Sequence, residues 1–359
     1  MGVLMMIFKI LAAIFVFGII ILVHELGHFL MCKLMGVRVN EFAIGMGPKL
    51  LSFGKKETAY TLRLFPIGGF CAMEGEEEDS DDPAALNNQG FWRKLLIFAA
   101  GALMNFLTGL VIILVLYAGV KAVNVPVIHG FADGCPLESA SGLQVGDRIL
   151  SIDGERIYTF SDVSLLLGRN KTGDFDLVIR RDGQKLRLEN FHMERGEYLD
   201  QSGQKFTGFG LYFGAEELTF GGRLQYCWDQ AVDFVRLVRL SLQMLITGEA
   251  GFSDMSGPVG IVSTITTVGE QSENARAAAA NIAYLAALIA VNLAVMNLLP
   301  LPALDGGKIF FLVVNALSLR IIRKQIPARF ENYVHLAGFV LLMGLMLVIT
   351  FHDVIKLFQ

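Results

Sequence analysis

The sequence predicts a polytopic α-helical membrane protein with four transmembrane helices, supplemented by a β-hairpin and one small α+β domain. Of its 359 residues, 53% are hydrophobic and only 18% are charged, a balance too apolar for an ordinary soluble globule. A helix needs about 20 apolar residues to cross about 30 Å of hydrocarbon. Four stretches meet this requirement, namely residues 4–30, 95–120, 277–304 and 333–351.

Composition and charge argue against several other classes of protein. The net charge of −4 argues against a nucleic-acid partner, and the apolar stretches predict a lipid bilayer as the surroundings. Four cysteines are scattered without C-x-x-C spacing, so neither a disulfide framework nor a cysteine zinc site is predicted. The dense acidic run EGEEEDSDD, residues 74–82, is typical of a solvated loop. A secretory signal is the alternative for the first stretch, but a basic start and a small-residue cleavage site are lacking.

The distribution of Lys and Arg indicates which connectors face the cytoplasm. Two connectors are basic. The connector after the first stretch contains Lys33, Arg38, Lys49, Lys55, Lys56, Arg63, Arg93 and Lys94. The connector before the last stretch contains Lys308, Arg320, Arg323, Lys324 and Arg329. Such connectors stay inside the cell, so both termini and residues 121–276 are expected outside. If residues 121–276 make no net crossing, the first and third stretches end at the same, cytoplasmic side.

The segment LVHELGHFL, residues 22–30, places three ionisable groups at the end of the first stretch. On a helix His24 and His28 project from one face, with Glu25 beside them, which is the H-E-x-x-H pattern of zinc sites. A charged side chain near the centre of a span costs about 2.5 to 3.5 kcal/mol, so such groups are functional by default. The motif therefore predicts bound Zn²⁺, held in part by the two histidines, with Glu25 as the general base.

A third protein ligand is expected at the same membrane depth. The segment NLLPLPALDGG, residues 297–307, ends the third stretch with Asp305, after Pro300 and Pro302 have broken the helix. Broken helices are tolerated at membrane depth where they line a cavity. Asp305 is thus the candidate third ligand, and the alternative is that it only caps the following helix.

The pairing of HELGH with N-x-x-P-x-P-x-x-D-G in a late span resembles the site-2 protease family of intramembrane zinc metalloproteases, in its bacterial, RseP-like branch. The segments IGMGP, FPIGGF and GPVGI are similar too, so the resemblance covers nearly the whole chain. It implies a set of site residues: His24, His28 and Asp305 as zinc ligands, Glu25 as the catalytic base, and Asn297 and Pro300 as substrate-holding residues. In GALMN, residues 101–105, the family often has proline where this chain has Ala102.

Two further parts of the chain predict how a substrate is held. Residues 50–65 alternate around Gly54-Lys55-Lys56 and predict a β-hairpin, whose edge strand offers free backbone groups to an unwinding peptide. A plain surface hairpin is the alternative, and the family resemblance favours a membrane-associated, substrate-binding one. Residues 136–157 (PLESASGLQVGDRILSIDGERI) resemble a run of bacterial PDZ domains, so one extracytoplasmic PDZ domain is expected over 125–193. Leu137 and Ser141 depart from the usual pattern, which leaves peptide binding open.

Four parts are expected in total. They are a membrane core with hairpin over 1–120, the domain over 125–193, an amphipathic helix and linker over 220–260, and a second membrane core over 277–359. The resemblance implies a protease of the bacterial plasma (inner) membrane, active near the cytoplasmic side. Its substrates are expected to be single-span proteins already trimmed by another protease, such as anti-sigma factors or signal-peptide remnants. Prenyl-type membrane proteases, which usually use later histidine or glutamate ligands, and an inactive scaffold or receptor with a PDZ domain are the alternatives.

Overall fold

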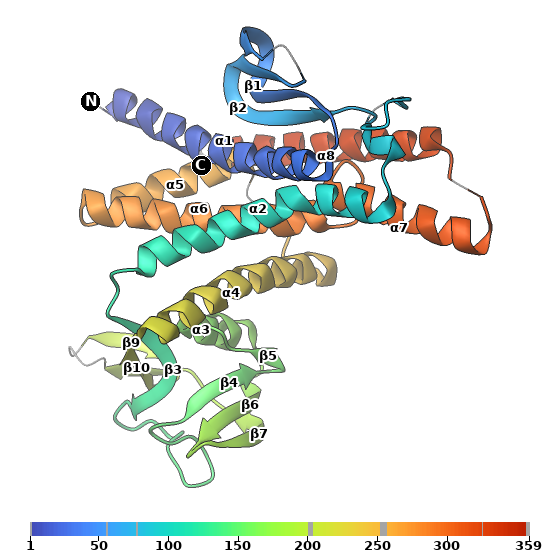
Figure 1. Cartoon of the computed structure of the whole chain (residues 1–359). Coiled ribbons are helices and arrows are strands. Elements are labelled where there is room, and N and C mark those ends of the chain that lie inside the picture. Colours follow the sequence, from blue (N-terminus) through green and yellow to red (C-terminus); the bar gives the residue numbers. More distant parts are fainter. Residues whose placement is uncertain are drawn as a thin grey trace. The chain divides into compact units, whose positions relative to one another are not determined.

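The structure is a computed structural model, and it describes residues 2–54, 57–76, 78–199, 204–251, 257–324 and 326–356. The chain divides into two compact units (Figure 1). The helical unit comprises Met1–Ile113 and Phe234–Gln359, and the sheet unit comprises Leu114–Asp233.

Four helices of the described residues are long and apolar enough to cross a membrane, as predicted. The helices are α1 (Gly2–Met35), α2 (Phe91–Tyr117), α6 (Ala275–Leu298) and α8 (Ala328–Lys356), with apolar windows at Ala13–Met35, Phe91–Tyr117, Ala275–Leu298 and Arg329–Lys356. The third of them ends at Leu298, so the predicted span over 277–304 was too long. Proline disfavours the helical conformation of the residue before it, and Pro300 therefore stops the helix. Helix α7 (Asp305–Ile321) begins after a short irregular segment.

The β-hairpin is longer than the predicted residues 50–65. Strands β1 (Val39–Phe53) and β2 (Ala59–Met73) pair antiparallel along their whole length. The glycine-rich segments IGMGP and FPIGGF lie within these strands, where register shifts let the ladder continue. Gly45 lies at one of these register shifts and has φ +83°. Only glycine fits there, because a Cβ would lie 2.4 Å from the carbonyl oxygen of Phe65. Lys55 and Lys56 of the predicted turn lie outside the described residues.

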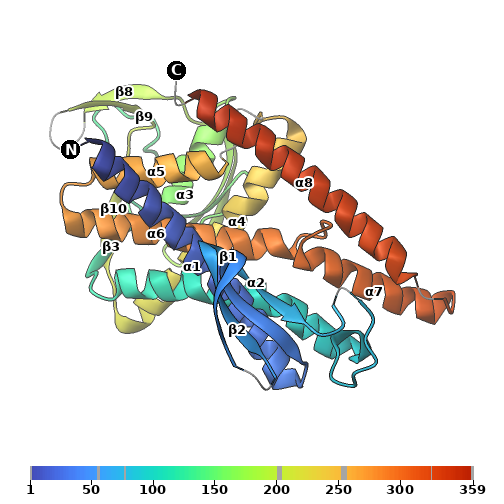
Figure 2. The same cartoon turned by 90° about the horizontal axis from the view of Figure 1, so that it is seen from above.

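The hairpin lies along α1 (Figure 2). A buried cluster joins the end of α1 to the hairpin and to the start of α2, and it consists of Cys32, Val37, Val39, Phe42, Cys71, Met73, Leu86, Ile97 and Phe98. Burial of apolar side chains stabilises such a junction by about 25 cal/mol per Å². The junction fixes the second half of α1, where the H-E-x-x-H motif lies.

The sheet unit contains a six-stranded sheet. Its main path has the order β10-β3-β4-β6-β7, and the strands are β3 (Ala122–Phe131), β4 (Arg148–Ile152), β6 (Asp174–Arg181), β7 (Gln184–His192) and β10 (Leu211–Glu217), with β5 (Glu155–Arg156) paired to β4. Helix α3 (Phe160–Arg169) and the separate hairpin β8 (Gly196–Leu199) and β9 (Lys205–Gly208) complete it. The sheet thus extends beyond residue 193, because β10 pairs with β3.

Two helices occupy the region after the sheet. Helix α4 (Phe220–Thr247) lies where the sequence predicts an amphipathic helix, and residues 252–256 of the predicted linker are outside the described part. Helix α5 (Pro258–Gln271) was not predicted. Its start explains the GPVGI segment, because the N–H groups of Gly257 and Gly260 both donate to Oδ2 of Asp353, at 2.9 and 2.8 Å.

Candidate metal and catalytic site

Helix α1 brings the two histidines of the motif together. His24 and His28 are one turn apart, and their Nε2 atoms lie 3.2 Å from each other. Both side chains are buried, with only 7% and 4% of the residue exposed. Two imidazole nitrogens therefore point at one place inside the helical unit.

Asp305 brings a carboxylate to the same place from the far end of the sequence. Its Oδ2 lies 3.0 Å from Nε2 of His24 and 3.2 Å from Nε2 of His28. Asp305 is the first residue of α7, whose N-cap is Leu304, and no side-chain capping bond is formed at that N-cap. The position of the carboxylate thus favours the interpretation of Asp305 as a ligand over that of a helix cap. Among the described residues, these three form the group of His, Cys, Asp and Glu side chains arranged to hold a metal ion.

The surroundings of the three side chains fit a metal ion. Two imidazole nitrogens and one carboxylate oxygen are a donor set of catalytic zinc sites, which keep a fourth position for water or substrate. Gly101 of α2 faces both imidazoles, and a Cβ built on it would lie 2.4 Å from Nε2 of His28 and 2.7 Å from Nε2 of His24. Only glycine leaves this side of the cluster open.

An outer hydrogen bond selects the nitrogen that His28 presents to the cluster. Nδ1–H of His28 donates to the carbonyl oxygen of Ile97 over 2.8 Å, which leaves Nε2 with a free lone pair. Around His24 the arrangement differs, because the amide groups of Asn105 and Asn297 both approach Nδ1 to 3.4 Å. Asn105 is completely buried, and its Oδ1 has no hydrogen-bond partner among the described residues. If this amide is turned over, its oxygen accepts Nδ1–H of His24.

Glu25 is held by the hairpin. The backbone N–H of Cys71 in β2 donates to Oε2 of Glu25 over 3.1 Å, and the glutamate is partly exposed. A carboxylate with one oxygen fixed in this way keeps the other available to accept a proton. The hairpin thus orients the predicted base.

The two residues predicted to hold the substrate lie at different places. Asn297 lies in the last turn of α6, beside His24 and partly exposed. Pro300 is exposed in the irregular segment between α6 and α7. Asn297 is therefore next to the cluster, whereas Pro300 lies at the break in the helix.

Sequence reasoning missed an ion pair beside the site. Lys308, one turn after Asp305, pairs with Glu76 of the acidic run, and its Nζ lies 5.7 Å from the ring centre of Phe98. Further members of this run also have partners, because Glu74 accepts from Ser80 and Asp82 pairs with Arg38; Glu77 lies outside the described residues. The described residues of this run do form a loop, with Glu78, Asp79 and Asp81 exposed, as predicted, but its ion pairs were not predicted. The number of acidic residues in a segment does not reveal that one of them, Glu76, pairs with a lysine 232 residues later.

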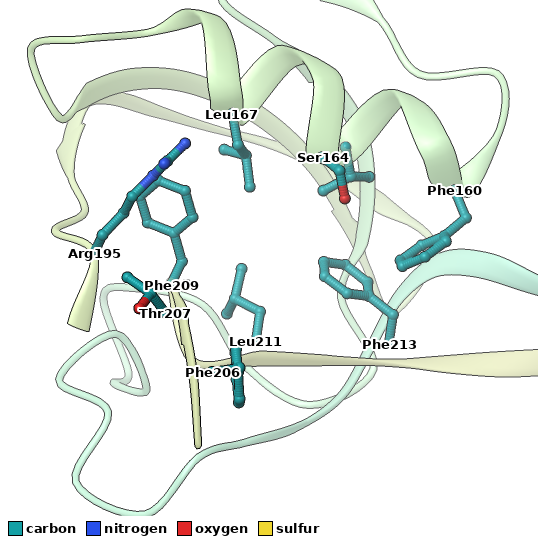
Figure 3. Close-up of a pocket in the computed structure, with 11 residues that line it drawn as sticks. Phe160, Ser164, Leu167, Arg195, Phe206, Thr207, Phe209, Leu211 and Phe213 are labelled. Atoms are coloured by element: carbon teal, nitrogen blue, oxygen red, sulfur yellow. The ribbon is translucent and has the colours of Figure 1, made fainter. Parts of the chain in front are cut away.

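A second candidate site lies within the sheet unit. A cavity of about 310 Å³ opens between α3 and the edge strand β10 (Figure 3). Its apolar walls are Phe160, Val163, Leu167, Phe206, Phe209, Leu211 and Phe213. Arg195 adds a positive charge at one end, with its guanidinium 5.5 Å from the ring centre of Phe209. An apolar cavity with one cation beside an edge strand suits an extended peptide.

Comparison with known proteins agrees with this geometry. Residues 12–345 match Peptidase family M50. A protein of Clostridium acetobutylicum, whose name marks it as a predicted zinc metalloprotease, is 35% identical over 97% of this chain and 98% of its own length. The zinc metalloprotease RasP of Geobacillus kaustophilus is 31% identical over 98% of both chains. The regulator of sigma-W protease RasP of Bacillus subtilis is 28% identical over 97% of this chain and 99% of its own.

Proposed function

The chain belongs to peptidase family M50, the site-2 type of zinc metalloprotease, and we propose that it hydrolyses peptide bonds within transmembrane segments of single-span proteins. The observation that carries this proposal is the cluster in which Asp305, the first residue of α7, meets His24 and His28 on a helix of membrane-spanning character. The relatives' names support the zinc-dependent chemistry. The alternative of an inactive scaffold loses support, because an intact ligand set has no use in a protein that only binds partners.

In the proposed mechanism each side chain has one role. His24, His28 and Asp305 would hold Zn²⁺, which when bound would supply a Lewis acid for the scissile carbonyl and for water at this site. Glu25 accepts a proton from the attacking water and later delivers it to the leaving nitrogen. The N–H of Cys71 keeps the carboxylate of Glu25 in the orientation for both transfers. We assign the holding of the substrate backbone to Asn297, which lies beside the cluster, and to Pro300, which lies at the break between α6 and α7.

The hairpin is the proposed place where a substrate helix unwinds. Its surface is unusually apolar, with exposed side chains of Ile44, Met46, Leu50, Leu51, Phe53, Tyr60, Leu62, Leu64 and Phe65. Such a patch favours contact with a membrane over contact with water. An unwound substrate can add as a strand to a hairpin edge, and β2 already holds Glu25. This supports the membrane-associated interpretation of the hairpin.

We further propose that the sheet unit is a PDZ-type domain that binds peptide ends outside the cytoplasm. A peptide added to β10 would place an apolar side chain in the cavity lined by α3 and its terminal carboxylate near Arg195 (Figure 3). A substrate trimmed by another protease presents such a new end, so the domain would select trimmed substrates in regulated intramembrane proteolysis. The basic connectors support this orientation, with both termini outside and the active site near the cytoplasmic side of a bacterial membrane.

The decisive experiment uses the purified full chain in detergent with a single-span substrate. Glu25→Gln should lower cleavage by about two to four orders of magnitude while the zinc content stays unchanged. Asp305→Ala should lose both zinc and cleavage. Cleavage that persists in the Glu25→Gln variant would exclude the mechanism proposed here. Partner binding without cleavage in the wild-type chain would instead indicate the scaffold.

The peptide site is tested separately. Binding of a peptide with a free carboxylate and an apolar last residue should weaken in Arg195→Ala, whereas binding of the amidated peptide should already be weak in the wild type. Equal binding of both peptides would contradict the proposed role of Arg195.

A further inference from the structure

The carboxylate of Asp305 is delivered by a strained turn. Residues 301–304 form a turn in which the N–H of Leu304 donates to the carbonyl oxygen of Leu301 over 3.3 Å. Pro302 is the second residue of this turn, and Ala303, the third, has φ +72°. Turns with proline second and positive φ third normally place glycine or asparagine there. An alanine in this conformation is disfavoured by contact of its Cβ with the backbone, so other contacts must hold the turn.

Helix α8 supplies these contacts at two points. Nδ1 of His335 accepts the N–H of Ala303 over 2.9 Å. One turn further along the helix, Gly338 packs so closely that a Cβ on it would lie 2.2 Å from Cβ of Pro302. The ring of His335 lies against Phe311 of α7, with ring centres 5.4 Å apart. The imidazole therefore touches both the turn and the helix that Asp305 begins.

We infer that His335 is a positioning residue for the zinc site, holding the turn that brings Asp305 to the two histidines. This inference rests on the proposed role of Asp305 as a zinc ligand. Asp305 follows Ala303 by two residues, so a relaxed φ at Ala303 would swing its carboxylate. The contacts of 3.0 and 3.2 Å with the histidines leave no room for such a movement. Without the imidazole acceptor, the N–H of Ala303 would be left unpaired in a strained conformation.

The test measures zinc affinity of the full chain in detergent by competition with a chelator. His335→Phe keeps a ring against Phe311 but removes the acceptor, and zinc should bind about 10- to 100-fold more weakly, as for other outer-shell partners. His335→Gln restores an acceptor and should recover part of the affinity. His352→Phe is the matched control on the same helix. Like Nε2 of His335, Nε2 of His352 is buried without a hydrogen-bond partner among the described residues. This substitution should leave the zinc affinity unchanged.

A second substitution separates positioning from folding. Glycine adopts φ +72° without strain, so Ala303→Gly in the His335→Phe background should restore most of the zinc affinity. Unchanged zinc affinity in His335→Phe, beside a clear loss in Asp305→Ala, would overturn the inference and leave the proposed function standing. A loss that Ala303→Gly does not restore would also overturn it. Unchanged zinc affinity in Asp305→Ala would instead refute the proposed ligand set itself.

Discussion

The two sides of the proposed zinc site are built in different ways. On one side, His24, Glu25 and His28 lie on an uninterrupted helix, and the helical repeat alone puts both imidazoles on one face. On the other side, Asp305 follows an irregular segment, and its place depends on the break between α6 and α7. The first arrangement is local in sequence, and the second needs contacts from other helices. Substitutions near each side should therefore act through different causes.

The largest effect is expected from Gly101→Ala, which attacks the histidine side. Alanine is a better helix former than glycine, so any loss comes from the new Cβ, which would meet Nε2 of both histidines. Zinc binding and cleavage should both be abolished, as measured by metal content and substrate cleavage. Gly109→Ala is the matched control on α2, because its Cβ would meet the side chain of Val291, 2.6 Å away, and not the ligands. Loss of zinc in the control alone would contradict the prediction.

A smaller effect should distinguish the two asparagines at His24. Asn105→Leu removes a buried amide that can accept Nδ1–H of His24, and zinc should bind about 10- to 100-fold more weakly. Asn297→Leu should leave the zinc affinity close to that of the wild type and lower kcat/KM, because the proposed task of this amide is to hold the substrate. Metal competition and cleavage kinetics on both variants check this division. If zinc loss were confined to Asn297→Leu, the two roles would be exchanged.

Sequence reasoning succeeded where the relevant signal is local or additive. The four apolar helices follow from run lengths, and the pairing of His24 with His28 follows from spacing. The count of basic residues in the connectors predicts that Asp305 shares the depth of the histidines, and the contact between their side chains agrees with it. The break at Pro300 was predicted from the sequence, and α6 ends before it at Leu298, short of the apolar stretch that continues to residue 304.

The parts that were missed depend on contacts between distant segments. The importance of Gly101 arises only when α2 packs on the histidines, and glycine is also common in apolar helices that merely pack closely against a neighbour. Glu76 was missed for the same reason, since it lies in a loop after β2 and its partner Lys308 lies far away in sequence, in α7. The hairpin was underestimated because glycine and proline segments look like loops, whereas register shifts include them in the strands.

The Glu76–Lys308 pair is a further contact between distant segments on the Asp305 side of the site. It joins the segment after β2 to the first turn of α7, and the two side chains are 19% and 32% exposed. Glu76→Gln should lower stability by about 1 kcal/mol, the upper range for partly exposed pairs, and should reduce zinc affinity slightly. The reversed pair Glu76→Lys with Lys308→Glu should recover only part of the stability in thermal unfolding, because position 308 also lies near the carboxylates of Asp305 and Glu25. Glu57→Gln, which removes the pair between Lys33 and Glu57 at the other end of the hairpin, should leave zinc unaffected.

The smallest effect is expected from a change of pH on the stability of the hairpin. It concerns Glu41 of β1, which belongs to neither side of the site. Burial raises the pKa of Glu41, but hydrogen bonds from Lys49, Thr61 and Arg63 outweigh it and bring the pKa down to about 2. Because the folded state favours the ionised carboxylate, Glu41 stabilises the hairpin above its ordinary pKa of 4.5, and this contribution is lost as the pH falls toward 2.

The stability lost over this pH range should be below about 1 kcal/mol, because the pair with Lys49 is half exposed. Thermal unfolding of the wild type at a pH just above 4.5 and again near 3 measures the loss, and Glu41→Gln should show less of it because the amide does not titrate. An equal loss in both proteins would assign the acid sensitivity to other carboxylates. Zinc release at low pH is a separate event, since protonation of the ligands displaces the metal whatever the state of the hairpin. Unfolding must therefore be followed in the zinc-free chain, where only the carboxylate of Glu41 differs between the two proteins.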